Sequence, residues 1–172
     1  MNPQLNIFKD SEKLSQHAAQ IFVEQAAQAI KERDRFLVAL NGGGTPTRLF
    51  QLLASDYKDK VDWNKVHIFW GDERCVPPDD AGSSYGQARD LLLSHVPISD
   101  SNIHRIKGDP STRSGQRLEP AEASRDYALT LSGFASPPLA VPRFDLVYLG
   151  MGEDGHTASL FPGSPMDVTE PT

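Results

Sequence analysis

Three short segments carry the side chains that can do chemistry in this chain. The first is a glycine run that ends at Thr45, the second holds Asp72 and Arg74, and the third holds His156. An arginine binds an anion through paired hydrogen bonds, and a histidine takes up or releases a proton near neutral pH. These residue types point to acid–base chemistry on an anionic ligand.

The glycine run consists of Gly42, Gly43 and Gly44 and is followed by Thr45 and Pro46. Glycines allow a ligand to approach the backbone closely, and free N–H groups at the start of a helix suit a phosphate. A tight turn between a strand and a helix explains the same pattern without any ligand. The segment lacks the Gly-Lys-Ser/Thr ending of a P-loop, which argues against a nucleoside triphosphate.

The charged segment directly follows an apolar run and reads Asp72-Glu73-Arg74. Arg74 has the planar, forked head group that binds phosphate, and Asp72 is suited to orient a base or a sugar hydroxyl. A solvated turn with a local ion pair is the alternative, since charged runs usually face water. Cys75 has no second cysteine with which to pair, and we interpret it as a structural residue.

The third segment begins with the spacing Gly150-x-Gly152-x-x-Gly155, which matches a dinucleotide-binding fingerprint. The sequence ends too soon after this motif for the helix, second strand and acidic ribose ligand that NAD binding needs. What remains is His156, in the glycine-rich segment that follows the apolar run 144–149 and at a point where a helix would start. We interpret it as a catalytic residue, with a structural histidine as the alternative.

The elements that must position these residues alternate between helices and strands. Apolar residues at helical spacing predict an amphipathic helix over 11–33, with Asp10 or Ser11 as its N-cap. Short continuous apolar runs predict buried strands, and further helical patterns follow the turns between them. The predicted strands are 36–40, 66–70, 103–106 and 144–149, and the other predicted helices begin at Pro46 and cover 84–94 and 119–133.

This alternation predicts an α/β fold with an open, mostly parallel sheet flanked by helices. In such sheets the ligand crevice lies at the carboxyl ends of the strands. All three chemical segments directly follow predicted strands. We therefore expect Gly42, Asp72 and His156 to lie along one edge of the sheet.

Length and composition limit the class of protein. The chain has 172 residues, a formal net charge of −6 and a single cysteine, which predicts one domain over 1–172 whose core needs no disulfide. No apolar run approaches the roughly 20 residues of a membrane span, and the start of the chain lacks the features of a signal peptide, so we expect a cytoplasmic protein. The acidic balance argues against nucleic-acid binding. The histidines lack metal-ligand spacing, so no metal site is predicted.

Together, the motifs resemble those of the 6-phosphogluconolactonases in the glucosamine-6-phosphate isomerase/6-phosphogluconolactonase family. The matching segments are Asn41-Gly-Gly-Gly-Thr-Pro, Trp70-Gly-Asp-Glu-Arg-x-Val-Pro and Gly150-Met-Gly-x-Asp-Gly-His-Thr-Ala-Ser-Leu-Phe-Pro-Gly. Their order and spacing fit over about residues 8–165. The related glucosamine-6-phosphate deaminases typically continue after Gly-His with Ile-Ala-Phe-Asn-Glu-Pro, whereas this chain continues with Thr-Ala-Ser-Leu-Phe-Pro. The lactonase branch is therefore favoured.

The resemblance implies a Rossmann-like α/β fold and the hydrolysis of 6-phospho-D-glucono-1,5-lactone to 6-phosphogluconate, a step of the oxidative pentose phosphate pathway. It implies that His156 is the general base that activates water and that Asp72 orients the base or the substrate. It further implies that Arg74 helps to hold the substrate phosphate, with the turn from Gly42 to Thr45 lining the same pocket. The implied ligand is a small sugar phosphate, and neither a cofactor nor a metal is implied.

The chain departs from the family pattern after the third motif. Family members continue well past Gly163 with further strands, a helix and typically a lysine near the phosphate, and we expect this chain to lack that C-terminal segment. A catalytically weak or inactive phosphosugar-binding remnant or fragment is therefore a second interpretation, and a glucosamine-6-phosphate deaminase-like enzyme is a third. A sheet edge left exposed in this way also favours self-association or a partner that covers it.

Overall fold

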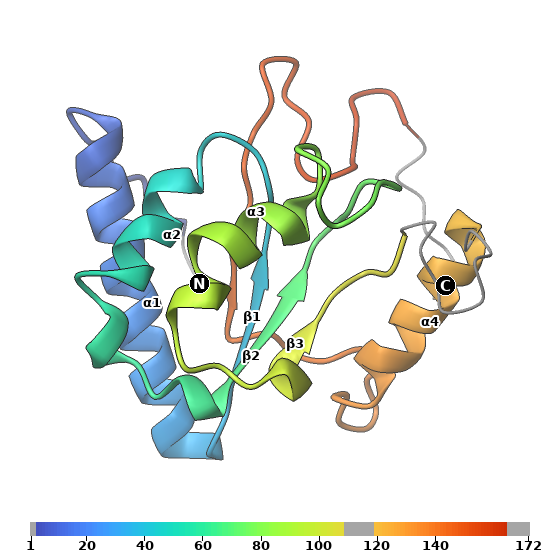
Figure 1. The fold of residues 1–172 in the computed structure, drawn as a ribbon, viewed down its shortest axis with the longest axis horizontal. Coiled ribbons are helices and arrows are strands. Elements are labelled where there is room, and N and C mark those ends of the chain that lie inside the picture. The colour runs from blue at the N-terminus through green and yellow to red at the C-terminus, as the bar shows by residue number, and fades with distance from the viewer. Residues whose placement is uncertain (1–2, 109–118, 165–172) are drawn as a thin grey trace.

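The computed structural model describes residues 3–108 and 119–164. Within these residues four α-helices and four strands follow one another along the chain (Figure 1). The helices are α1 (Ser11–Arg33), α2 (Thr47–Ala54), α3 (Ser84–Leu91) and α4 (Pro120–Ser132). The strands are β1 (Phe36–Leu40), β2 (Val66–Trp70), β3 (Ile103–His104) and β4 (Leu146–Val147). Single 3-10 turns span Lys58–Lys60, Trp63–Lys65, Leu93–His95 and Asp100–Asn102.

The strands form one parallel sheet in the order β3-β2-β1-β4. β1 and β2 pair along their whole length, from Phe36 opposite Val66 to Leu40 opposite Trp70. β4 pairs with the other side of β1. The predicted α/β architecture with an open, helix-flanked sheet is therefore confirmed. The carboxyl ends of β1, β2 and β4 lie at one edge of this sheet.

Helices cover both faces of the sheet (Figure 1). Because side chains alternate along a strand, Phe36, Val38 and Leu40 of β1 belong to the main core with α1, α2 and α3, whereas Leu37 and Ala39 belong to a second core on the opposite face. The second core is completed by Phe69, Tyr127, Leu131, Phe134 and Phe144. Both faces of β1 are buried, which explains its uninterrupted apolar sequence.

Two strands are shorter than predicted. β4 covers only part of 144–149. At its start the side chain of Asp145 takes the place of a backbone acceptor, because its Oδ2 accepts the Leu37 N–H at 2.8 Å. Arg33 holds the other oxygen of this carboxylate at 2.7 Å. β3 covers only the first two residues of 103–106.

The helix boundaries follow the local sequence. Asp10 caps α1, because its carboxylate accepts the Lys13 N–H at 2.8 Å, and this prediction is confirmed. α2 begins one residue later than predicted, with Pro46 as its N-cap. The predicted helix 84–94 is divided into α3 and a 3-10 turn, because the backbone at Leu92 leaves the helical conformation.

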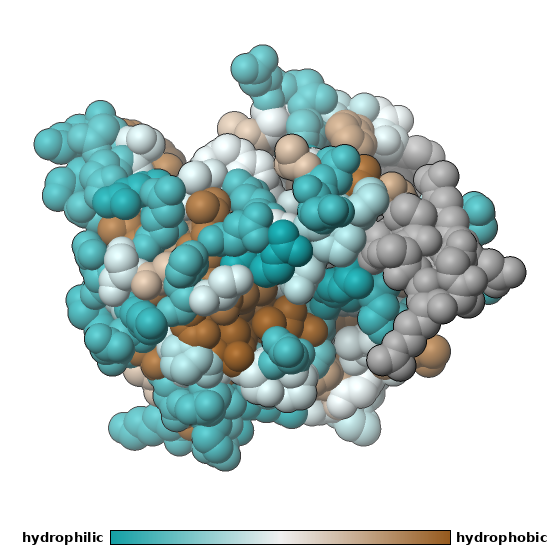
Figure 2. Space-filling model, viewed as in Figure 1, coloured by the Kyte–Doolittle hydropathy of each residue, from teal (hydrophilic) through white to brown (hydrophobic). Residues whose placement is uncertain are grey.

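Hydrophilic side chains cover much of the face shown in Figure 2, including the side of the molecule formed by α1 (left in the view). Salt bridges join exposed charged residues, such as Arg48 with Glu12 at 2.6 Å. None of the described helices is long and apolar enough to cross a membrane.

A single tyrosine fixes α4 to the end of β2. The Tyr127 hydroxyl donates to the Trp70 carbonyl at 2.8 Å and accepts the Trp70 N–H at 3.0 Å. Burial raises the pKa of Tyr127 to about 12, so the hydroxyl keeps the proton that it donates. These two hydrogen bonds hold the last residue of β2 directly before Gly71 and Asp72.

A pair of half-buried histidines connects β2 to β3. Nδ1 of His67 lies 3.2 Å from Nε2 of His104, and Phe134 packs against both rings. Burial and the neighbouring His67 lower the pKa of His104 to about 4. Burial also lowers the pKa of His67. Both rings are therefore neutral in the folded chain at neutral pH.

We expect the chain to lose stability as the pH falls from about 6.5 toward 4. Unfolded His104 takes up a proton near pH 6.5, whereas folded His104 does so only near pH 4, so acid favours unfolding. Because the ring is partly exposed, the expected loss is about 1–2 kcal/mol, or a few degrees in melting temperature. Melting curves across this pH range check the prediction. His104→Phe should lose less stability over this pH range than the wild type does. An equal pH dependence of the two proteins would contradict the role given to His104.

Candidate active site

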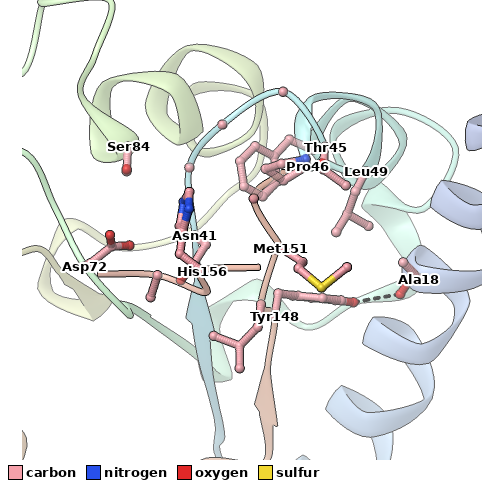
Figure 3. Close-up of a pocket in the computed structure, with 18 of the residues that line it drawn as sticks. Ala18, Asn41, Thr45, Pro46, Leu49, Asp72, Ser84, Tyr148, Met151 and His156 are labelled. Atoms are coloured by element: carbon pink, nitrogen blue, oxygen red, sulfur yellow. Dashed lines mark hydrogen bonds between the residues drawn. The ribbon is translucent and has the colours of Figure 1, made fainter. Parts of the chain in front are cut away.

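A cavity of about 370 Å³ opens at the carboxyl edge of the sheet (Figure 3). All seven site residues predicted from the sequence line it. They are Gly42, Gly43, Gly44 and Thr45 after β1, Asp72 and Arg74 after β2, and His156 after β4. The structure thus brings the predicted residues together, because the ends of parallel strands share one edge.

One side of the cavity is apolar. It is formed by Leu14 and Ala18 of α1, Leu49 of α2 and Met151 of the loop after β4. The hydroxyl of Tyr148 donates to the Ala18 carbonyl at 2.7 Å, which ties the end of β4 to α1 (Figure 3). Burial raises the pKa of Tyr148, so this hydroxyl stays neutral. The cavity therefore suits a ligand with one polar and one less polar side.

His156 is paired with a carboxylate, that of Asp154. Its Nδ1 lies 2.5 Å from Oδ1 of Asp154, and its backbone N–H donates to the same oxygen at 3.2 Å. The hydrogen bond from His156 lowers the pKa of Asp154, which is ionised at neutral pH. Because an ionised carboxylate only accepts hydrogen bonds, Nδ1 carries the proton in the neutral form of the ring and Nε2 keeps its lone pair. The ring is thus held in the tautomer that a general base needs.

The loop that carries His156 folds back on itself. The Gly152 N–H donates to the His156 carbonyl at 2.8 Å, and the Thr157 hydroxyl donates to the Gly150 carbonyl at 2.8 Å. A Cβ on Gly152 would collide with the imidazole, so a glycine is needed there. The imidazole also contacts Phe161, with ring centroids 4.8 Å apart. The position of the imidazole is therefore determined mainly by its own loop.

Asp72 bonds to a serine of a neighbouring loop. Its Oδ2 accepts from the Ser159 hydroxyl at 2.7 Å, which connects the loop after β2 to the loop after β4. The carboxylate that holds the imidazole of His156 is that of Asp154 instead. Of the two roles expected for Asp72, orientation of the substrate therefore stays as the prediction.

The other two residues of the charged segment have different contacts. Glu73 caps α3, because its carboxylate accepts the N–H groups of Ser84 and Tyr85, each at 2.8 Å. The guanidinium of Arg74 donates to the Gly82 carbonyl at 3.0 Å. Across residues 3–108 and 119–164 no carboxylate forms a salt bridge with Arg74. The local ion pair that would explain this segment as a simple solvated turn is therefore not formed.

The glycine turn is held by a glutamine of α3. Gln87 accepts the Gly43 N–H at 3.0 Å and donates to the Gly43 carbonyl at 2.7 Å. Gly43 has a φ of 103°, which favours glycine. α2, which follows this turn, has no side-chain cap at its N-terminus. An uncapped helix start beside the cavity suits an anion, although the Gly43 N–H itself is already bonded.

The residues that hold the site in place were not predicted from the sequence. Asp154 and His156 lie two residues apart, and this spacing is the one signal for their contact. Nothing local indicates that Ser159 reaches Asp72, because 87 residues separate them. Asn41 was not predicted as a site residue either, although it directly follows β1 and lines the cavity.

Comparison with known proteins relates the chain to a family of sugar-phosphate enzymes. The family model described as glucosamine-6-phosphate isomerases/6-phosphogluconolactonase matches residues 9–172. A probable chloroplastic 6-phosphogluconolactonase of Oryza sativa subsp. indica is 40% identical over 169 residues, covering 94% of this chain and 49% of that protein. The 6-phosphogluconolactonase of Mycobacterium tuberculosis is 38% identical over 165 residues, covering 96% and 65%. The chain thus spans about half to two thirds of the length of these relatives.

Solved structures share this fold. The 6-phosphogluconolactonase of Trypanosoma brucei superposes with a TM-score of 0.79 at 30% identity, over 95% of this chain and 65% of that one. The enzyme of Thermotoga maritima superposes with a TM-score of 0.74 at 29% identity, over 91% of this chain and 63% of that one. The family match extends over nearly the whole chain, and the three motifs meet in one cavity. The chain belongs to the glucosamine-6-phosphate isomerase/6-phosphogluconolactonase family.

Proposed function

We propose that this chain hydrolyses 6-phospho-D-glucono-1,5-lactone to 6-phosphogluconate, with His156 as the general base. The observation that carries the proposal is the hydrogen-bonded pair of His156 and Asp154, beside Arg74 and the glycine turn in one cavity. The relatives from rice and Mycobacterium tuberculosis, both named as 6-phosphogluconolactonases, support this choice of substrate.

The path of the proton follows from the tautomer of His156. Nε2 takes a proton from a water molecule, and the water oxygen attacks the lactone carbonyl carbon to form a tetrahedral oxyanion. The Asp154 carboxylate stabilises the resulting imidazolium. When the bond between C1 and the ring oxygen breaks, the imidazolium returns the proton to that oxygen, and the carboxylic acid product then ionises. The scheme uses neither a cofactor nor a metal.

Arg74 and the start of α2 hold the substrate phosphate in this scheme. The guanidinium has five N–H donors, and its described contact is a single one to the Gly82 carbonyl. The uncapped N-terminus of α2 adds the positive end of a helix dipole. Asp72, which Ser159 holds in place, accepts a hydrogen bond from a sugar hydroxyl. The phosphate and the reacting carbon are therefore bound by different groups.

The direct test is acid release from freshly prepared 6-phosphogluconolactone, titrated beside a blank for spontaneous hydrolysis. A rate above the blank that scales with protein concentration would support the proposal. Binding of the phosphosugar without such a rate would overturn it and identify the chain as a binding remnant or fragment, which is the second interpretation of its sequence.

Asp154→Ala should lower kcat by about 10-fold to 100-fold, because the imidazolium loses its counter-ion and the ring its orientation. The effect is limited because 58% of the Asp154 side chain is exposed, so water replaces part of the interaction. Initial rates of acid release at neutral pH measure the change.

Glu153→Ala is the matched control for Asp154→Ala. It removes the negative charge of the preceding residue and leaves the hydrogen bond between Asp154 and His156 in place. We expect wild-type kcat for this control. An Asp154→Ala variant with the same kcat as the control would show that Asp154 does not assist the base.

Three expectations stay predictions. A single domain over 1–172 is the first, and a cytoplasmic location is the second, although the rice relative is named as a chloroplastic protein. The third is that a second copy or another partner covers the free edge of β4, which pairs only with β1 within the described residues.

A further inference from the structure

One polar side chain in the cavity has no role in the scheme above. Asn41 directly follows β1 and precedes the glycine turn, so the end of the strand places it in the wall of the cavity. Only 8% of the residue is exposed. Figure 3 shows Asn41 at the foot of the glycine turn, on the side of the cavity that also holds Asp72 and His156.

The carboxamide of Asn41 forms no hydrogen bond with the described part of the chain. Its Oδ1 is fully buried without a donor and faces Gly71, where a Cβ would collide with this oxygen. Buried polar groups nearly always have a partner, and one without a partner lowers the stability of the fold. Nδ2, the other end of the carboxamide, also has no partner in the described part of the chain, and it is not fully buried, so it is the end that a ligand in the cavity can reach.

The surroundings of Asn41 determine which kind of ligand atom it meets. Oδ1 is turned to Gly71, so the end of the carboxamide left for a ligand is Nδ2, which donates hydrogen bonds. The Asp72 carboxylate and Nε2 of His156, which share the cavity, are acceptors. The Gly43 N–H is engaged by Gln87. A ligand oxygen that gains negative charge therefore finds a suitable donor in Asn41.

We propose that Nδ2 of Asn41 donates a hydrogen bond to the C1 oxygen of the bound lactone and stabilises the negative charge that forms there when water attacks. This inference rests on the proposed function and assigns its oxyanion donor. A neutral carboxamide suits the role, because it stabilises the charge without giving up a proton. Burial against Gly71 holds the group in place, so it needs no reorganisation during the reaction.

Kinetics of two variants test this role. Asn41→Ala should lower kcat about 100-fold and change KM by less than about threefold, because the hydrogen bond strengthens only as the charge develops. Asn41→Asp, which has the same shape and no donor, should lower kcat at least as much. Asn64→Asp adds the same charge on an exposed turn before β2 and should keep the wild-type kcat. If Asn41→Ala keeps kcat or raises only KM, the proposal is overturned.

A binding measurement separates this inference from the proposed activity. 6-Phosphogluconate carries a carboxylate at C1, whereas glucitol 6-phosphate carries a hydroxyl there. Measured by calorimetry, Asn41→Asp should weaken the binding of 6-phosphogluconate at least about 10-fold and the binding of glucitol 6-phosphate less than about threefold. If the wild type hydrolyses the lactone but both ligands are affected equally, the inference fails and the activity stands. If the wild type does not hydrolyse the lactone but shows the selective loss, the activity fails and the contact to the C1 oxygen stands.

Melting temperatures distinguish this role from a structural one. Because the carboxamide of Asn41 has no partner among the described residues, its removal in Asn41→Ala costs no hydrogen bond. The variant should melt at or above the wild-type temperature. A stable variant with a reduced kcat supports the proposal. An Asn41→Ala protein that melts lower and loses kcat and affinity together would show that Asn41 supports the glycine turn, which overturns it.

Discussion

Replacement of His156 by asparagine should lower the kcat of lactone hydrolysis by about 10²–10⁴-fold. Asparagine keeps a polar group in the cavity but cannot take a proton from water at neutral pH. The affinity for 6-phosphogluconate should change little, because the groups proposed to hold the phosphate are Arg74 and the start of α2. Acid-release assays and calorimetry on one preparation measure the two effects side by side.

The same preparation separates a catalytic His156 from a structural one. The imidazole contacts Phe161 and the bonded loop around it, so a purely structural ring would, when replaced, lower melting temperature and affinity together. His17→Asn, at an exposed position of α1, is the matched control and should leave kcat, affinity and melting temperature unchanged. A His156→Asn protein that folds, binds and turns over at near the wild-type rate would remove His156 from the mechanism.

The parts of the fold that local sequence predicts well are those with local causes. Every residue of β1 is buried on a face of the sheet, so its apolar run is continuous and its predicted bounds agree with the structure. The cap of α1 by Asp10 depends on residues three apart. β4 is different, because Asp145 ends its regular pairing through a hydrogen bond to Leu37, 108 residues away. No local pattern encodes that contact.

The same distinction applies to the candidate site. The site residues gather because parallel strands align their carboxyl ends, which is a property of the fold rather than of the side chains. Their contacts depend on how the loops after β2 and β4 fold, and these were not predictable. The charged segment shows the result: Asp72 bonds to Ser159, Glu73 caps α3, and Arg74 donates to the Gly82 carbonyl. Three adjacent charges therefore have three different roles.

Arg74→Ala should weaken 6-phosphogluconate binding by about 10–100-fold, because a charge-assisted, forked contact to phosphate contributes roughly 1.5–3 kcal/mol. The affinity of the variant for gluconate, which lacks the phosphate, should fall much less. The basis is the position of Arg74 in the cavity wall, without a carboxylate partner among the described residues. Calorimetry with both ligands measures the difference.

Two further variants show whether the effect of Arg74 depends on its forked shape or only on its charge. Arg74→Lys keeps the charge and loses the fork, so its affinity for 6-phosphogluconate should be intermediate. Arg125→Ala removes an exposed positive charge from α4 and should bind as the wild type does. If Arg74→Ala weakens the binding of gluconate and of 6-phosphogluconate by the same factor, Arg74 acts through its hydrogen bond to Gly82 and not through a contact to the phosphate. The uncapped start of α2 would then be left as the phosphate-binding group.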